Sequence, residues 1–147
     1  MKIREAGAGD IEAIVSLLAD DGLGRGRERP GDPAYLLAFD AMSRQPGNVY
    51  LVAEMADQIV GCLQVTIIHG LSRAGATRAQ IEGVRVAASA RGAGIGDALM
   101  QAAVDRARAE GASLVQLTSD KVRTDAHRFY ERLGFVASHD GFKLALD

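Results

Sequence analysis

A run of closely spaced glycines in the second half of the chain has the composition of an anion-binding loop. It follows a strand-like run at residues 81–86, precedes an amphipathic helix expected at residues 98–110, and consists of Arg91, Gly92, Ala93, Gly94, Ile95, Gly96 and Asp97. Glycines let a backbone turn tightly and expose its N–H groups, and the start of a helix adds partial positive charge. Arg91 adds a full positive charge. The loop is therefore predicted to bind a pyrophosphate group.

The spacing of the glycines narrows the class of ligand. A dinucleotide-binding fingerprint counted from Gly92 would need its third glycine at position 97, where the chain has Asp97. The Gly-Lys-Ser/Thr ending of a nucleoside triphosphate loop does not occur in the sequence. A dinucleotide-binding protein is therefore disfavoured. On the loop alone, an ordinary tight turn before a helix is the alternative.

The glycine loop at residues 91–97 resembles the acetyl-CoA pyrophosphate loop of the GCN5-related N-acetyltransferase (GNAT) family. That loop, Gln/Arg-x-x-Gly-x-Gly/Ala, is matched by Arg91, Gly94 and Gly96. Residues 125–135 resemble the second signature of the family, Ala-x-x-x-Tyr-Glu-x-x-Gly-Phe, and residues 3–11 resemble its first strand and helix start. The motifs occur in the family's order and spacing from end to end of the chain. The resemblance implies the GNAT fold and an N-acetyltransferase that uses acetyl-CoA as cosubstrate.

The resemblance also implies which residues meet the cosubstrate. The seven loop residues would hold the pyrophosphate, and the backbone of Val84, Arg85 and Val86 would pair with the pantetheine arm. A backbone N–H near Val86 would meet the thioester oxygen. Gly83 is compatible with a bulge that separates this strand from its neighbour, although an ordinary strand with an incidental glycine is the alternative.

One position departs from the family pattern. Arg123 stands where many members have an asparagine that contacts CoA. Its guanidinium is expected to reach a CoA phosphate instead, and a simple surface cation is the alternative.

Two side chains are candidates for the catalytic proton transfers. Tyr130 matches the tyrosine that protonates the departing thiolate in the family, although its helical spacing alone also fits a core position. Glu82 is the candidate base. It is expected to alternate with Val84 and Val86 on one face of the strand, where partial burial would raise its pKa. A structural ion pair between Glu82 and Arg78 or Arg85 is the alternative.

The acceptor is expected to be a primary amine of a small molecule. The loop at residues 22–33 carries Arg25, Arg27 and Arg29, which fit either a solvated flexible lid or a contact to an anionic acceptor. A protein or peptide amine and a non-catalytic acyl-CoA-binding module are the other functions left open.

Composition and patterning predict one GNAT domain over residues 1–147, of α+β class. We expect a single mixed sheet of six to seven strands flanked by about four helices, closed by a hairpin at residues 135–137 and 142–146. A net charge of −2 gives no reason to expect nucleic acid or membrane partners. The start of the chain has no signal-peptide pattern, which favours a cytoplasmic protein. No metal site is expected, and a homodimer is compatible with the resemblance.

Overall fold

The structure is a computed structural model that describes residues 1–147. Its contacts divide the chain into two compact units, Met1–Gln116 and Leu117–Asp147. The first unit holds nearly all of the sheet and four of the helices, and the second holds α5 (Thr124–Arg132). A single domain over the whole chain stays a prediction. No helix combines the length and the apolar composition needed to cross a membrane.

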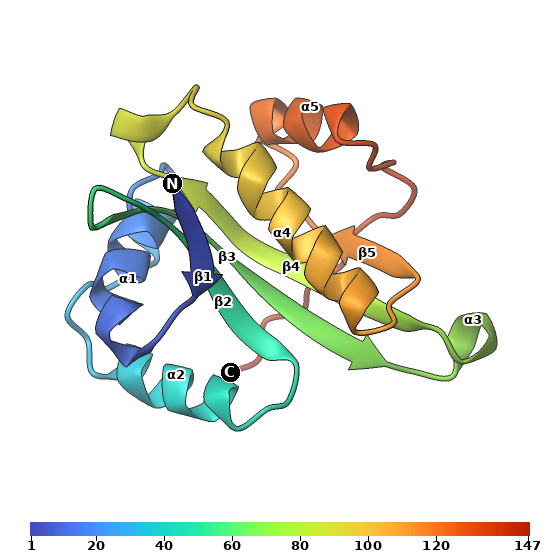
Figure 1. Ribbon diagram of the computed structural model, residues 1–147. Helices are drawn as coiled ribbons and strands as arrows, with labels where there is room; N and C mark the ends of the chain where they lie inside the picture. The colour runs from blue at the N-terminus through green and yellow to red at the C-terminus, as the bar shows by residue number, and fades with distance from the viewer. The chain divides into compact units, whose positions relative to one another are not determined.

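The chain forms one five-stranded sheet in the order β1-β2-β3-β4-β5 (Figure 1). Neighbours among the first four strands are antiparallel. Two hydrogen bonds give the direction of β5: Ser113 N donates to Thr77 O (3.0 Å), and Gln116 Nε2 donates to Gln80 Oε1 (2.8 Å). Because the residue numbers of the partners increase in the same direction on both strands, β5 runs parallel to β4. The predicted α+β class with a mixed sheet is thus confirmed. The strands are β1 (Lys2–Glu5), β2 (Asn48–Met55), β3 (Gln58–His69), β4 (Thr77–Val86) and β5 (Leu114–Leu117).

Helices cover both faces of the sheet, because β2 and β3 carry apolar side chains on both sides. α1 (Ile11–Ala19) packs on the face that carries Val52 and Cys62. α4 (Ile95–Ala109) lies across the opposite face (Figure 1), where Leu63 and Val65 are fully buried. The other helices of this unit are α2 (Ala34–Ser43) and the short α3 (Ser72–Gly75), and 3₁₀ turns occur at Ala8–Asp10, Gly24–Gly26 and Ala88–Ala90.

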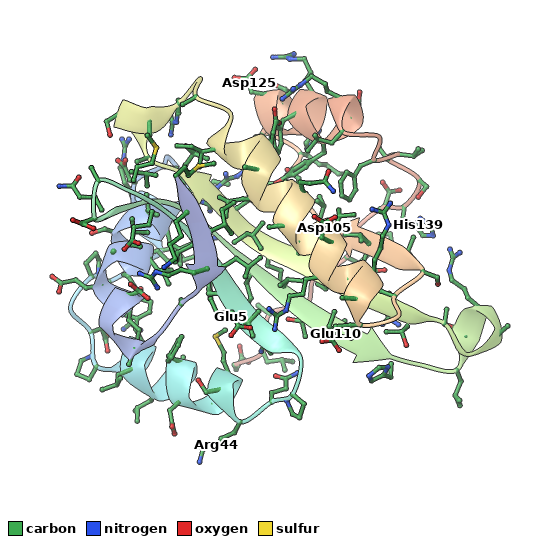
Figure 2. All side chains as sticks on the ribbon, viewed as in Figure 1. Glu5, Arg44, Asp105, Glu110, Asp125 and His139 are labelled. Carbon is green, nitrogen blue, oxygen red and sulfur yellow. The ribbon has the colours of Figure 1, made fainter.

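The first turn of α4 sits directly on β3. A Cβ at Gly61 would lie 2.9 Å from both Ile95 Cγ2 and Leu99 Cδ1, so only glycine allows this close approach. Ile95 is 2% exposed and Leu99 is fully buried. Near the other end of α4, Arg106 forms an ion pair of 2.6 Å with Glu5. Glu5 lies at the end of β1 and is labelled in Figure 2. The start of α4 is therefore fixed by the core rather than by the loop before it.

The sheet has fewer strands than the six to seven expected, because the predicted closing hairpin is absent. Residues 135–147 form no strand. Phe142, Leu144 and Leu146 alternate as a strand would, but they are 94%, 86% and 89% exposed. Alternation predicts a strand only where a neighbouring strand supplies hydrogen bonds and one face is buried. This segment has neither.

Candidate functional site

The glycine loop adopts the exposed, tightly turned conformation that anion binding requires. Gly92 and Gly94 have φ of +84° and +76°, in the left-handed region that disfavours other residues. Added side chains would meet nothing within 4 Å at either position, so the space in front of the backbone is open. Arg91 is exposed on the same loop.

The helix that follows begins earlier than the sequence indicates. α4 starts at Ile95 rather than at residue 98, so Gly96 and Asp97 belong to its first turn. The first amide bonded in the helical pattern is Ala98 N, which donates to Gly94 O (3.1 Å). The amides of Ile95 and Gly96 precede it and have no partner within the helix. Together with the helix dipole, they form the positive end of the loop.

The last residues of β4 offer a free backbone edge. The pairing offset of 36 residues between Gln80 and Gln116 would place Leu117, the end of β5, opposite Ile81 (117 − 36 = 81). Beyond Ile81, β5 no longer accompanies β4. Ala87 N donates to Val60 O (2.7 Å) on β3, and successive amides of a strand alternate in direction. The N–H of Val86 is therefore directed away from β3, toward the free edge.

A β-bulge at Gly83 decides between the two alternatives that the sequence left open for this glycine, and it overturns a prediction about Glu82. Gln64 pairs with Glu82, and Cys62 pairs with Arg85. The two pairs are three residues apart on β4 but only two residues apart on β3, so β4 contains one extra residue. Gly83 lies within this interval and has a φ of +61°. The extra residue shifts the alternation of side chains between the two faces of the sheet by one position for the residues that follow it. Glu82 therefore shares its face with Arg85, whereas Val86, opposite Gly61, faces α4 together with Val84. The expectation that Glu82, Val84 and Val86 share a face is wrong.

Arg85 uses its side chain for structure rather than for a ligand. Its Nε lies 2.7 Å from Asp21 Oδ2, and the two side chains are 14% and 17% exposed. The Nε–H is not aligned with that oxygen, so the contact is an ion pair without a hydrogen bond at Nε. Nη1 of Arg85 donates to Val84 O (2.9 Å). Any contact of Arg85 with a cosubstrate would therefore come from its backbone.

Glu82 lies on a polar part of the sheet face. It is exposed rather than partly buried, so the burial expected for this side chain is wrong. Opposite it, Gln64 donates to Asn48 Oδ1 (2.8 Å), and Thr66 donates to the same oxygen (3.2 Å). The predicted alternative of an ion pair to Arg85 is also wrong, because Arg85 pairs with Asp21. Solvent or a ligand can thus reach the Glu82 carboxylate.

The arginine-bearing loop between α1 and α2 satisfies its charges largely within itself. Arg27 Nε donates to Glu28 Oε2 (3.0 Å), and Arg29 pairs with Asp32 at 3.5 Å. The hydroxyl of Tyr35 donates to Glu28 Oε1 (2.9 Å) and accepts from Arg29 N (2.8 Å). These contacts explain why Glu28 is only 16% exposed.

In the second unit, Tyr130 lies near the end of α5 in an aromatic cluster. Its ring meets those of Phe129 and Phe135 edge to face, at centroid distances of 5.2 and 6.0 Å. Gly134, with a φ of +97°, reverses the chain after the helix. Phe135 N then donates to Tyr130 O (3.0 Å) and Gly134 N to Glu131 O (3.0 Å), the two bonds of a Schellman motif. The Gly-Phe pair of the second signature therefore fixes the orientation of Tyr130.

The second unit also contains Arg123, at the residue immediately before α5. Its backbone N–H donates to Asp120 O (3.0 Å), and His127 Nε2 lies 2.9 Å from the same oxygen. The structure thus gathers the glycine loop and β4 in the first unit, and Tyr130 and Arg123 in the second.

Three residues that interact with Arg85 or with one another on this face escaped the sequence analysis: Asp21, Glu28 and Tyr50. Asp21 and Glu28 gave no signal beyond being polar residues in a loop. Tyr50 lies opposite Gln64 in the structure, and this register includes an irregularity between Ala53 and Glu54 that the sequence did not reveal.

Comparison with known proteins agrees with this arrangement. Residues 11–135 match the model of the acetyltransferase (GNAT) family. An aminoalkylphosphonate N-acetyltransferase of Salmonella typhimurium is 34% identical over 113 residues, covering 77% of this chain and 73% of its own. An L-methionine sulfoximine/L-methionine sulfone acetyltransferase of Pseudomonas paraeruginosa is 30% identical over 142 residues, covering 92% and 80%.

A solved structure extends the likeness over the whole chain. A crystal structure from Bacillus halodurans, described as a transcriptional regulator, is 49% identical and covers 99% of both chains with a TM-score of 0.95. The family match spans both the glycine loop and the Tyr130 helix. The chain therefore belongs to the GNAT family of acetyltransferases.

Proposed function

We propose that the protein transfers the acetyl group of acetyl-CoA to the primary amine of a small molecule. The observation that carries this proposal is the pair of left-handed glycines, Gly92 and Gly94, leading into the start of α4 beside the free edge of β4. A pyrophosphate at the loop and an extended thioester arm along β4 would use both features. The relatives from Salmonella and Pseudomonas, named for small acceptors, support a small molecule rather than a protein.

The reaction needs one proton removed and one supplied. The amine nitrogen attacks the thioester carbon, and Glu82 takes the proton that the nitrogen loses. The N–H of Val86, directed to the free edge, would stabilise the oxyanion of the tetrahedral intermediate. When the C–S bond breaks, the hydroxyl of Tyr130 gives its proton to the thiolate of CoA. The exposure of Glu82 suits this role, because the base must meet an amine that arrives from solvent.

The function is tested by measuring free thiol released from acetyl-CoA with a panel of amines. We expect amine-dependent release with at least one of 2-aminoethylphosphonate, L-methionine sulfone and spermidine, confirmed by mass spectrometry of the acetylated product. A lysine-containing peptide is included to test the protein-acceptor alternative. Tight CoA binding without release by any amine would instead support a non-catalytic acyl-CoA-binding module.

The base is tested by Glu82→Gln, which keeps the shape of the side chain but cannot take the proton. We expect kcat to fall by about 100-fold, while the affinity for acetyl-CoA is unchanged. Glu110→Gln is the matched control, because this exposed glutamate lies at the C-terminal end of α4, outside the proposed site (Figure 2). An equal kcat in the wild type and Glu82→Gln would exclude Glu82 as the base.

A further inference from the structure

The hydroxyl of Tyr50 is a partly buried polar group that the reaction scheme leaves unused. The Tyr50 ring packs against the cluster of Ile14, Leu17, Val52 and Cys62 beneath α1, which holds it in place. The hydroxyl makes no hydrogen bond to another group of the protein. Buried tyrosine hydroxyls usually have a hydrogen-bond partner, because burying a hydroxyl without one costs free energy. A ligand is a candidate for the missing partner.

The hydroxyl lies directly over the bulge of β4. A Cβ at Gly83 would be 3.2 Å from Tyr50 Oη and 3.4 Å from Leu18 Cδ2. Gly83 therefore leaves space at the hydroxyl that any other residue would fill. Tyr50 pairs with Gln64 on β3, and Gln64 pairs with Glu82 on β4, so all three side chains belong to one face of the sheet.

The surroundings keep this hydroxyl protonated. Burial raises the pKa of Tyr50 above its ordinary value, and the nearby Cys62 and Glu82 raise it further. At neutral pH the group can therefore both donate and accept a hydrogen bond. Of the charged neighbours, Arg85 is paired with Asp21 and Glu28 with Arg27, whereas Glu82 forms no ion pair. The local charge excess is negative, which favours an acceptor that arrives as an ammonium ion.

We infer that Tyr50 binds the acceptor substrate, and that its hydroxyl hydrogen-bonds a polar group next to the reactive amine. The inference rests on the proposed function, because it places the amine at Glu82. The amine would then lie on the face of β4 that carries Glu82, beside the bulge, while the acetyl-CoA arm uses the backbone edge of the same strand. Tyr50 would thereby select amines that carry a hydrogen-bonding group close to the nitrogen.

The test is Tyr50→Phe, assayed with whichever of 2-aminoethylphosphonate and L-methionine sulfone gives the higher kcat/KM, because both carry a hydrogen-bonding group close to the amine. We expect the KM for this amine to rise about tenfold, as for the loss of one hydrogen bond, with kcat changed less than about threefold. The KM for acetyl-CoA should be unchanged. The Tm should be unchanged or higher, because the hydroxyl has no protein partner to lose. Tyr35→Phe is the contrast, because its hydroxyl bonds Glu28 and Arg29 and its loss should lower the Tm.

Three outcomes would overturn the inference: an unchanged amine KM, an equal rise in the acetyl-CoA KM, or a clear fall in the Tm of Tyr50→Phe. Equilibrium binding of the same two amines, followed by NMR without acetyl-CoA, separates this inference from the proposed function. If the wild type binds an amine more tightly than Tyr50→Phe but transfers no acetyl group, the function fails and the contact stands. If no amine binds the wild type, the contact fails as well.

Discussion

Gly94→Asp is expected to weaken the binding of coenzyme A by about 100-fold, because it places a carboxylate where the pyrophosphate would lie. Gly94 has a φ of +76° and immediately precedes α4, next to the amides of Ile95 and Gly96. Aspartate tolerates the left-handed region better than most residues, so the fold should survive. Isothermal titration calorimetry with CoA measures the effect, and a thermal melt checks the fold.

The matched control for this charge effect is Gly94→Asn. Asparagine has almost the same shape as aspartate and also adopts the left-handed region, but it is neutral. We expect it to weaken CoA binding by less than about tenfold, and the gap between the variants to narrow at high salt. Equal affinities of the two variants would show that the loop does not hold an anion. That result would remove the main support for acetyl-CoA as cosubstrate.

Tyr130→Phe is expected to lower kcat by about 100-fold or more without changing the affinity for acetyl-CoA. Phenylalanine keeps the ring that packs edge to face on Phe129 and Phe135, so α5 and its Schellman motif should persist. The substitution removes the hydroxyl that would supply the proton to the departing thiolate. Steady-state kinetics with the best amine of the panel, together with calorimetry of CoA, separates the two quantities.

Either of two results would argue against Tyr130 as the acid. An unchanged kcat would leave it a packing residue, as its helical spacing alone suggests. A loss of CoA affinity that matched the loss of kcat would make it a binding residue instead. Phe129→Leu tests whether disturbing the aromatic cluster is itself enough to lower kcat, and we expect a much smaller effect.

The sequence predicted the features that depend on local backbone chemistry. Gly92 and Gly94 mark the left-handed turn, because glycine is the residue that adopts this conformation without strain, whereas Gly83 was only compatible with the bulge that the structure shows. The β2–β3 hairpin was predicted from two apolar runs around a short turn, and Ala56 and Asp57 form that turn with positive φ. Each of these signals lies within a few residues of the structure that it specifies.

Features that depend on distant partners could not be predicted in the same way. The pairing of Arg85 with Asp21 follows from the fold, which brings the end of α1 to β4. The face of Glu82 depends on where the bulge inserts its extra residue, and simple alternation cannot show this. The exposed alternating residues from Phe142 onward show the converse case, a strand pattern without a neighbouring strand.

The bulge at Gly83 also affects how the gene for this protein can change. Its extra residue lets Glu82 and Arg85, which are three positions apart, lie on the same face of the sheet. Loss of a single codon at the bulge would remove the extra residue, so Glu82 could stay opposite Gln64 and Arg85 opposite Cys62 in a regular ladder. We therefore expect natural variants that lack one residue at this point of β4 to keep the ion pair between Arg85 and Asp21.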